Sequence, residues 1–200
     1  MADTYYTIAA VSEGIYKEKM SKFISFAIPV ETAAKAKEEI AKKQNEYHDA
    51  RHVCWAFMIG PKRTEFLSND NGEPSGTAGK PILGQINSFG LTDVVVIVVR
   101  YFGGIKLGTS GLIAAYREAA RLALQDAQVI ECHEKVQFHF NFPYISMNEV
   151  MKVVKQSGAK VLAQQFDNVC SMSIEINADQ SNALQARLDN IDGVTMCNDD

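Results

Sequence analysis

A glycine-rich stretch, RYFGGIKLGTSGL at residues 100–112, contains the residue types with which many proteins hold phosphate groups. Free backbone N–H groups at a helix N-terminus attract anions, and a nearby lysine adds a positive charge. The spacing GxxxxG before Thr109 and Ser110 approaches the Walker pattern GxxxxGK[ST], but Thr109 stands where the lysine must be. Two interpretations stay open. The stretch is either an anion-binding loop or a glycine-rich turn in which Thr109 or Ser110 caps the next helix.

A second glycine-rich loop, NGEPSGTAGKP at residues 71–81, also approaches a phosphate loop and also departs from the pattern. Lys80 follows a glycine, but Pro74 occupies the place of the first Walker glycine and Pro81 replaces the serine or threonine. Polar side chains are concentrated among these glycines and prolines. The loop is therefore either a shaped binding loop or a plain surface connection.

Other chemistries have weaker support. The stretch HDARH, residues 48–52, spaces two histidines like a zinc motif but lacks the HExxH glutamate, so an ordinary helix end and no metal site are expected. The four cysteines are scattered without a CxxC pair, which predicts buried or half-buried thiols in a reducing compartment. No GxSxG elbow occurs, and no cofactor is expected.

The elements that must position these loops are readable from apolar patterns. The run DVVVIVV at residues 93–99 has no polar alternation, which predicts a strand buried on both faces. Residues 6–12, 22–30 and 53–60 predict further strands, with GIYKEKM (14–20) as a polar connection. Helices are expected over residues 32–50, from about Thr77, and over 112–127.

The remaining chain predicts a second domain. A strand at 135–142, a helix ending at Gly158, a hairpin at Asp167-Asn168, a second helix and a last strand give the order βαββαβ. This is the ferredoxin-like arrangement. The expected domains are residues 1–130 and 131–200.

Charge is distributed unevenly between these two parts. The whole chain has a net charge of -4, made up of 15 basic and 14 acidic residues before residue 131 and 5 basic and 10 acidic residues from there on. A polyanion would therefore have to bind a local patch on the first part. The basic strip Arg100, Lys106, Arg117 and Arg121, with Lys80, is either such a face or merely solvated. No signal peptide or apolar span is visible, so a cytoplasmic protein without membrane association is expected.

Taken together, GEPSGTAGKPIL (72–83) and VVRYFGGIKLGTSGLIAAY (98–116) closely resemble the signature of the Impact family. The upstream stretches YKEKMSKFISFAIPV (16–30) and DARHVCWAF (49–57) fit the same family. Residues 131–200 resemble the small domain that its YigZ-like bacterial members append.

The resemblance implies an α+β fold. Its first domain would be an α/β sandwich like the second domain of ribosomal protein S5, with a mixed, four-stranded sheet and helices on one face. Its second would be ferredoxin-like, similar to the last domain of the ribosomal translocase. This pairing implies a non-enzymatic, translation-associated protein that binds RNA, the ribosome or a translation-control protein. Eukaryotic relatives carry a further N-terminal domain, so their specific role does not transfer. No catalytic residues are carried over.

Two other functions remain as alternatives. Small-molecule kinases share the S5-like fold and hold ATP phosphates on a similar loop before a helix, so a nucleotide or small-molecule enzyme is possible by fold analogy. A protein-interaction module is the third reading, and the oligomeric state is not predicted. The acidic second domain and the lack of an exposed-aromatic motif oppose RNA binding. The candidate binding residues are Glu73, Ser75, Thr77, Lys80, Arg100, Tyr101, Lys106, Gly108, Thr109, Ser110, Arg117 and Arg121.

Overall fold

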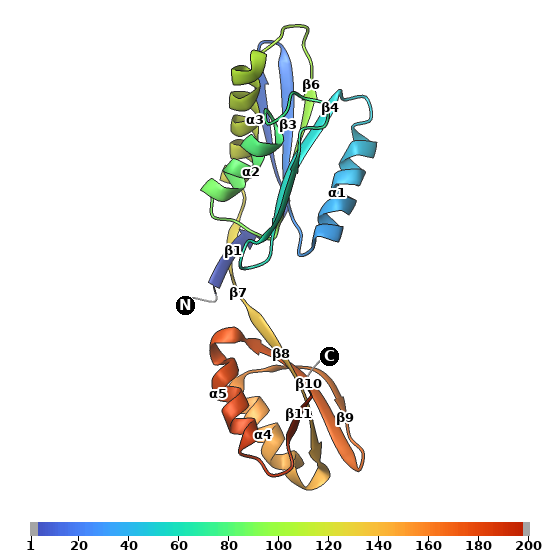
Figure 1. The fold of residues 1–200 in the computed structure, drawn as a ribbon, viewed down its shortest axis with the longest axis vertical. Helices are drawn as coiled ribbons and strands as arrows, with labels where there is room; N and C mark the ends of the chain where they lie inside the picture. The colour runs from blue at the N-terminus through green and yellow to red at the C-terminus, as the bar shows by residue number, and fades with distance from the viewer. Residues whose placement is uncertain (1–3, 198–200) are drawn as a thin grey trace. The chain divides into compact units, whose positions relative to one another are not determined.

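A computed structural model describes residues 4–197, which divide into two compact units (Figure 1). One unit is Tyr5–Cys132, and the other is formed by the chain from His133 onward together with Thr4. The predicted boundary at residue 130 falls two residues before this division. In the described part of the chain, no helix is long and apolar enough to cross a membrane.

The first unit is built on a five-stranded sheet with the order β2-β3-β6-β4-β5, and every neighbouring pair in it is antiparallel. The expectation of a mixed, four-stranded sheet was wrong in these details, although the α+β class is confirmed. A separate two-stranded sheet joins β1 to β7. The strands are β1 (Thr4–Ile8), β2 (Ser12–Glu18), β3 (Ser21–Pro29), β4 (His52–Ile59), β5 (Glu65–Asn69), β6 (Val94–Tyr101) and β7 (Val129–His133).

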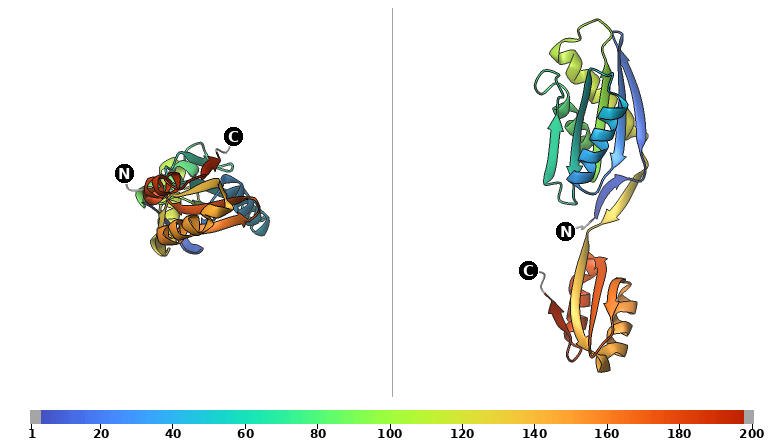
Figure 2. Two further views of the ribbon diagram at one scale, coloured as in Figure 1. Left: turned by 90° about the horizontal axis from the view of Figure 1, so that it is seen from below. Right: turned by 90° about the vertical axis from the view of Figure 1, so that its right-hand side faces the viewer.

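Helices cover both faces of this sheet, not one face as expected (Figures 1 and 2). Ala36 and Ile40 of α1 pack on one face, while α2 and α3 pack on the other. The reason lies in β6, whose first seven residues are all buried, so an apolar side chain on either face needs a cover. The helices are α1 (Ala33–Glu46), α2 (Gly79–Ser88) and α3 (Gly108–Gln125).

The segment GIYKEKM, expected as a connection, is mostly strand β2. Its side chains alternate between half-buried and exposed positions, which fits an edge strand covered on one face only. Lys19 and Met20 both have positive φ, 43° and 66°, and make the tight turn that leads into β3. A turn with positive φ at both central residues has the twist of the paired strands that it joins, so Lys19 and Met20 favour the hairpin of β2 and β3.

The second unit has the predicted βαββαβ order and the strand order β11-β8-β10-β9, with all neighbours antiparallel. This is the ferredoxin-like arrangement. Gly158 ends the first helix in the left-handed region, as expected, and Ser146 at the N-cap position of that helix donates its hydroxyl to Asp192 O at 2.8 Å. The elements are β8 (Lys135–Pro143), the 3-10 turn η1 (Tyr144–Ser146), α4 (Met147–Ser157), β9 (Lys160–Gln165), β10 (Val169–Asn177), α5 (Ala178–Asp189) and β11 (Thr195–Cys197).

Candidate functional site

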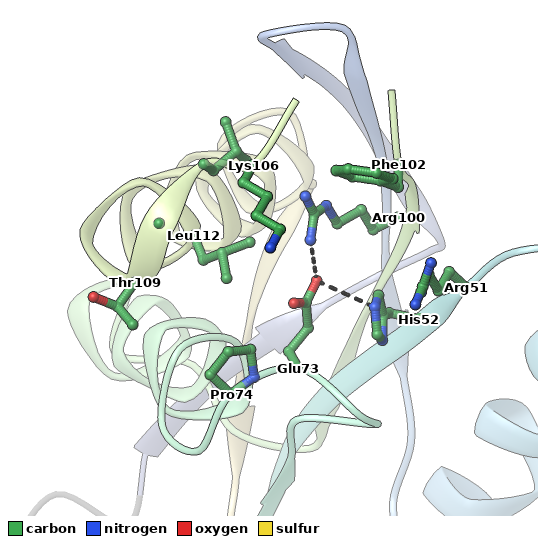
Figure 3. A pocket seen from close by; sticks show the side chains of 11 residues that line it. Arg51, His52, Glu73, Pro74, Arg100, Phe102, Lys106, Thr109 and Leu112 are labelled. Atoms are coloured by element: carbon green, nitrogen blue, oxygen red, sulfur yellow. Dashed lines mark hydrogen bonds and ion pairs between the residues drawn. The ribbon is translucent and has the colours of Figure 1, made fainter. Parts of the chain in front are cut away.

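The two glycine-rich loops of the first unit meet at a pocket of about 340 Å³ (Figure 3). The loop before α2 contributes two residues and the loop between β6 and α3 contributes three. The end of β6, the start of β4 with the residue before it, and the first turns of α3 complete the wall. The lining residues are Arg51, His52, Glu73, Pro74, Arg100, Phe102, Lys106, Leu107, Gly108, Thr109 and Leu112.

A buried ion pair forms the floor of this pocket. Nη1 of Arg100 donates to the carboxylate of Glu73 at 2.6 Å, and the hydroxyl of Tyr116 donates to the same oxygen at 2.8 Å. Both side chains of the pair are buried, with 6% and 4% of their surface exposed. Removing either partner would leave an uncompensated buried charge, which would destabilise the fold. The intact pair therefore holds the loop that carries Glu73 against the end of β6.

His52 completes the floor because of strand register. In the antiparallel pairing of β4 with β6, His52 lies directly opposite Arg100. Its Nδ1 is 2.8 Å from the carbonyl oxygen of Asn71, and its Nε2 is 3.8 Å from Glu73 Oε1 (Figure 3). The prediction of a helix end at HDARH holds for His48 alone, whose Nδ1 lies 3.3 Å from the carbonyl oxygen of Asn45 in the last helical turn. It was wrong for His52, because the helix stops at Glu46 and His52 begins a strand.

A thiol lies behind the floor and plays a packing role. Cys54 donates to the carbonyl oxygen of Asp70 at 2.9 Å, and its sulfur is 3.4 Å from the hydroxyl of Tyr116. Burial raises the pKa of Cys54 to about 12, against the opposing effect of the Tyr116 hydrogen bond. Burial and the neighbouring Cys54 also hold the pKa of Tyr116 well above its usual range. Because a thiol must ionise to act as a nucleophile, the burial of Cys54 and its raised pKa disfavour a nucleophilic role at neutral pH.

The rim of the pocket is cationic and aromatic. Arg51, Lys106 and the ring of Phe102 are all exposed there. The guanidinium carbon of Arg100 lies 5.4 Å from the centre of the Phe102 ring and 5.5 Å from that of Phe23. Three cationic side chains thus line the pocket against one carboxylate, which is already bonded to Arg100. Lys106 extends toward the Glu73–Arg100 pair in Figure 3.

The glycines of RYFGGIKLGTSGL have identifiable roles. A Cβ on Gly103 would lie 2.0 Å from the carbonyl oxygen of Met20, so only glycine permits this close approach to the β2–β3 turn. Gly108 begins α3 with a φ of 74°. Neither Thr109 nor Ser110 is the cap, contrary to one expectation, because both lie inside the first turn and Leu107 holds the N-cap position without a side-chain bond. The first-turn N–H groups of a helix have no partner within the helix.

The backbone N–H groups of the second loop already bind a carboxylate of the protein itself. Asp70 accepts hydrogen bonds from the backbone N–H groups of Gly76, Ala78 and Gly79, at 2.8, 2.9 and 2.8 Å. Burial raises the pKa of Asp70, but these three hydrogen bonds and the charge of Lys80 outweigh it and leave the pKa below its ordinary value. The N-terminus of α2 is thus occupied by the protein itself, and this loop contributes Glu73 and Pro74 to the pocket instead of an amide cradle.

The structure brings together five of the predicted site residues and separates the rest. Glu73, Arg100, Lys106, Gly108 and Thr109 line the pocket, although Thr109 directs its hydroxyl away from Glu73 in Figure 3. Two others line a neighbouring hollow beside α2 and α3, where they widen the positive surface. These are Lys80 and Arg117.

The other predicted residues have different surroundings. Ser75 and Ser110 are exposed outside both hollows, and Thr77 is buried and donates to the carbonyl oxygen of Pro74 at 2.6 Å. Tyr101 donates its hydroxyl to Asp49 at 2.8 Å, and Arg121 is paired with Glu118 at 2.7 Å. These bonds give Thr77, Tyr101 and Arg121 local partners.

Sequence reasoning did not name six of the lining residues, and three of these, Arg51, His52 and Phe102, carry a charged, polar or aromatic side chain. The stretch DARHVCWAF, which contains two of them, carried a usable signal, because it matched the family together with the two loops. Phe102 lies inside the first loop, but phenylalanine is not a phosphate-binding residue type, so the pattern of that loop does not single it out. Its exposed ring removes one objection to RNA binding, the missing aromatic side chain.

Comparison with known proteins decides the family. The profile of the Impact N-terminal domain matches residues 19–124, more than half of the chain. The chain belongs to the Impact family. The matched range contains every residue that lines the pocket, so the pocket lies within the family domain.

Relatives of this Impact chain match it beyond that domain. The Bacillus subtilis family member YvyE is 34% identical over 157 residues, which cover 78% of this chain and 72% of that protein. The Escherichia coli member YigZ is 30% identical over 172 residues, 85% of this chain and 84% of that protein. A crystal structure of a protein described as hypothetical superposes over 100% of this chain and 99% of its own, with a TM-score of 0.79 and 25% identity. The two-domain organisation of this Impact chain therefore has a full-length structural counterpart.

Proposed function

We propose that this Impact family chain is a cytosolic, non-enzymatic, translation-associated protein that binds RNA, free or in the ribosome. One observation carries the proposal: the two signature loops converge on a pocket whose rim exposes cationic side chains. Family membership supports the translation context.

Phosphate recognition would begin at the rim. Arg51 and Lys106 are exposed, whereas the carboxylate of Glu73 is bonded to Arg100 and so opposes an incoming anion less than a solitary carboxylate would. The first turn of α3 adds N–H groups and the positive end of the helix dipole at Gly108 and Thr109. Lys80 and Arg117 continue the positive charge onto the neighbouring hollow.

Binding of a fluorescently labelled single-stranded RNA, followed by anisotropy, tests the proposal. We expect Lys106→Glu and Arg117→Glu to weaken binding, and the wild-type affinity to fall as salt rises. Each lost phosphate contact should flatten the log–log salt slope by about 0.7. Lys37→Glu is the matched control, because Lys37 is exposed on α1, which covers the opposite face of the sheet.

Sedimentation with bacterial ribosomes at low salt extends the test to the translation context. The proposal predicts cosedimentation that Lys106→Glu abolishes and Lys37→Glu retains. It fails if the wild-type chain binds neither RNA nor ribosomes at low salt. It also fails if the Lys37 variant loses binding to the same extent as the Lys106 variant.

A second candidate is binding of a free nucleotide or another small anionic molecule. The observation in its favour is the pocket itself, which combines apolar walls with the buried polar floor of Glu73, Arg100 and His52. Thermal unfolding with a panel of nucleotides and inorganic phosphate tests it. A response to nucleotides without any RNA binding would favour this candidate, and a flat response across the panel would exclude it.

A further inference from the structure

The geometry points to a more specific ligand: we infer that the pocket accepts one unstacked base of single-stranded RNA, while the rim holds the adjoining phosphate. This inference rests on the proposed function and names the form of RNA that the site selects.

The first support is the ring of Phe102, which forms one wall of the pocket and lies beside Arg100 of the floor. Phe102 is 40% exposed and lines the pocket, although large apolar side chains are usually buried. The guanidinium of Arg100, anchored by Glu73, lies 5.4 Å from its ring centre. An exposed ring fixed on one side offers a stacking surface, and base–aromatic stacking is a general means of holding single-stranded nucleic acid.

The second support is the size and lining of the pocket. A volume of about 340 Å³ lies at the small end of the range for ligand pockets and has room for one base. Pro74, Leu107 and Leu112 add apolar walls to that of Phe102. A base in a duplex is stacked on its neighbours and cannot enter such a space, so the pocket should discriminate against duplex RNA.

The third support is the separation of polar groups between floor and rim. His52, Glu73 and Arg100 at the floor carry nitrogen and oxygen atoms that can meet the polar edge of a base. Lys106, Gly108 and Thr109 stand on the α3 side of the pocket, where Lys106 and the first-turn amides suit a phosphate. A nucleotide unit has this combination of a flat polar-edged ring and a charged group.

The test compares a single-stranded RNA of roughly ten nucleotides with the duplex of the same sequence. We expect the single strand to bind at least tenfold more tightly. Phe102→Leu, which keeps an apolar side chain but removes the ring, should weaken single-strand binding roughly fivefold or more. Phe102→Trp should retain it, since the ring is restored in a larger form.

Phe66→Leu is the matched control, because Phe66 is an exposed phenylalanine on β5 that does not line the pocket. Its variant should bind like the wild type. Thermal unfolding of all variants separates loss of binding from loss of folding, and the exposed position of Phe102 predicts little change in stability.

Equal affinity for single strand and duplex would overturn the inference, as would a Phe102→Leu variant that binds like the wild type. If binding then still depended on Lys106, the proposed RNA-binding function would stand without base insertion. Absence of any RNA binding by the wild-type chain would instead overturn the proposed function and this inference together.

Discussion

Glu73 and Arg100 form a buried ion pair, 2.6 Å between the carboxylate oxygen and Nη1, that joins one signature loop to the end of the central strand β6. The residues are far apart in sequence, and their contact closes the floor of the pocket. The pair therefore links the stability of the domain to the shape of the candidate site.

Removing the carboxylate should be costly. We expect Glu73→Ala to lower the free energy of unfolding by about 3–5 kcal/mol, because it leaves the Arg100 guanidinium buried without its charge partner. Urea unfolding followed by circular dichroism measures this loss. The double variant Glu73→Leu with Arg100→Met should recover much of it, since neither charge remains. A Glu73→Ala variant as stable as the wild type would contradict the structural role of the pair.

Asp70 should make stability depend on pH. Its three backbone hydrogen bonds keep the folded-state pKa below the ordinary value of 3.8, so its contribution is present above that pH and is lost as the pH falls through the folded-state pKa. We expect Asp70→Asn to be less stable than wild type by about 1–2 kcal/mol at neutral pH. Urea titrations at several pH values should show this difference shrinking below pH 3.8. A difference that stays constant into that range would contradict the assignment.

Adjacent glycines in the loop RYFGGIKLGTSGL should respond differently to substitution. A Cβ at Gly103 would overlap the backbone carbonyl of Met20, whereas a Cβ at Gly104 would meet nothing within 4 Å and would only strain a φ of 88°. Gly104→Ala should therefore cost about 1–2 kcal/mol, and Gly103→Ala more than that. Thermal unfolding ranks the two variants. The reverse order would show that the approach of Met20 is not tight.

Thiol reactivity should separate the cysteines. Cys197 is exposed, which corrects the expectation that all four thiols are at least half-buried, while Cys54 and Cys170 are buried. We expect a thiol reagent at mildly alkaline pH to label Cys197 first. Cys54 should react only on unfolding, because burial raises its pKa to about 12 and blocks access. Mass spectrometry of the labelled peptides identifies the sites, and early labelling of Cys54 would contradict its packing role.

The sequence by itself determined the strongest elements and the identity of the family. The unbroken apolar run that became β6 predicted a strand buried on both faces, and the structure confirms it with α1 on one face and α2 and α3 on the other. The second unit could be read because its helices and strands alternate with clear end signals, such as Gly158. The signature loops were recognisable because their residues are adjacent in the chain.

Only the tertiary structure decided how the loops are used. Asp70 fills the N-terminus of α2, so one of the two loops that resemble a phosphate cradle is occupied, and the pocket forms instead around Glu73 and the start of α3. His52 enters the site because the β4–β6 register places it opposite Arg100, a contact across 48 residues that no local pattern encodes. The spacing of apolar residues along the chain predicts which segments form helices and strands. The pairing of distant strands depends instead on the packing of the whole sheet.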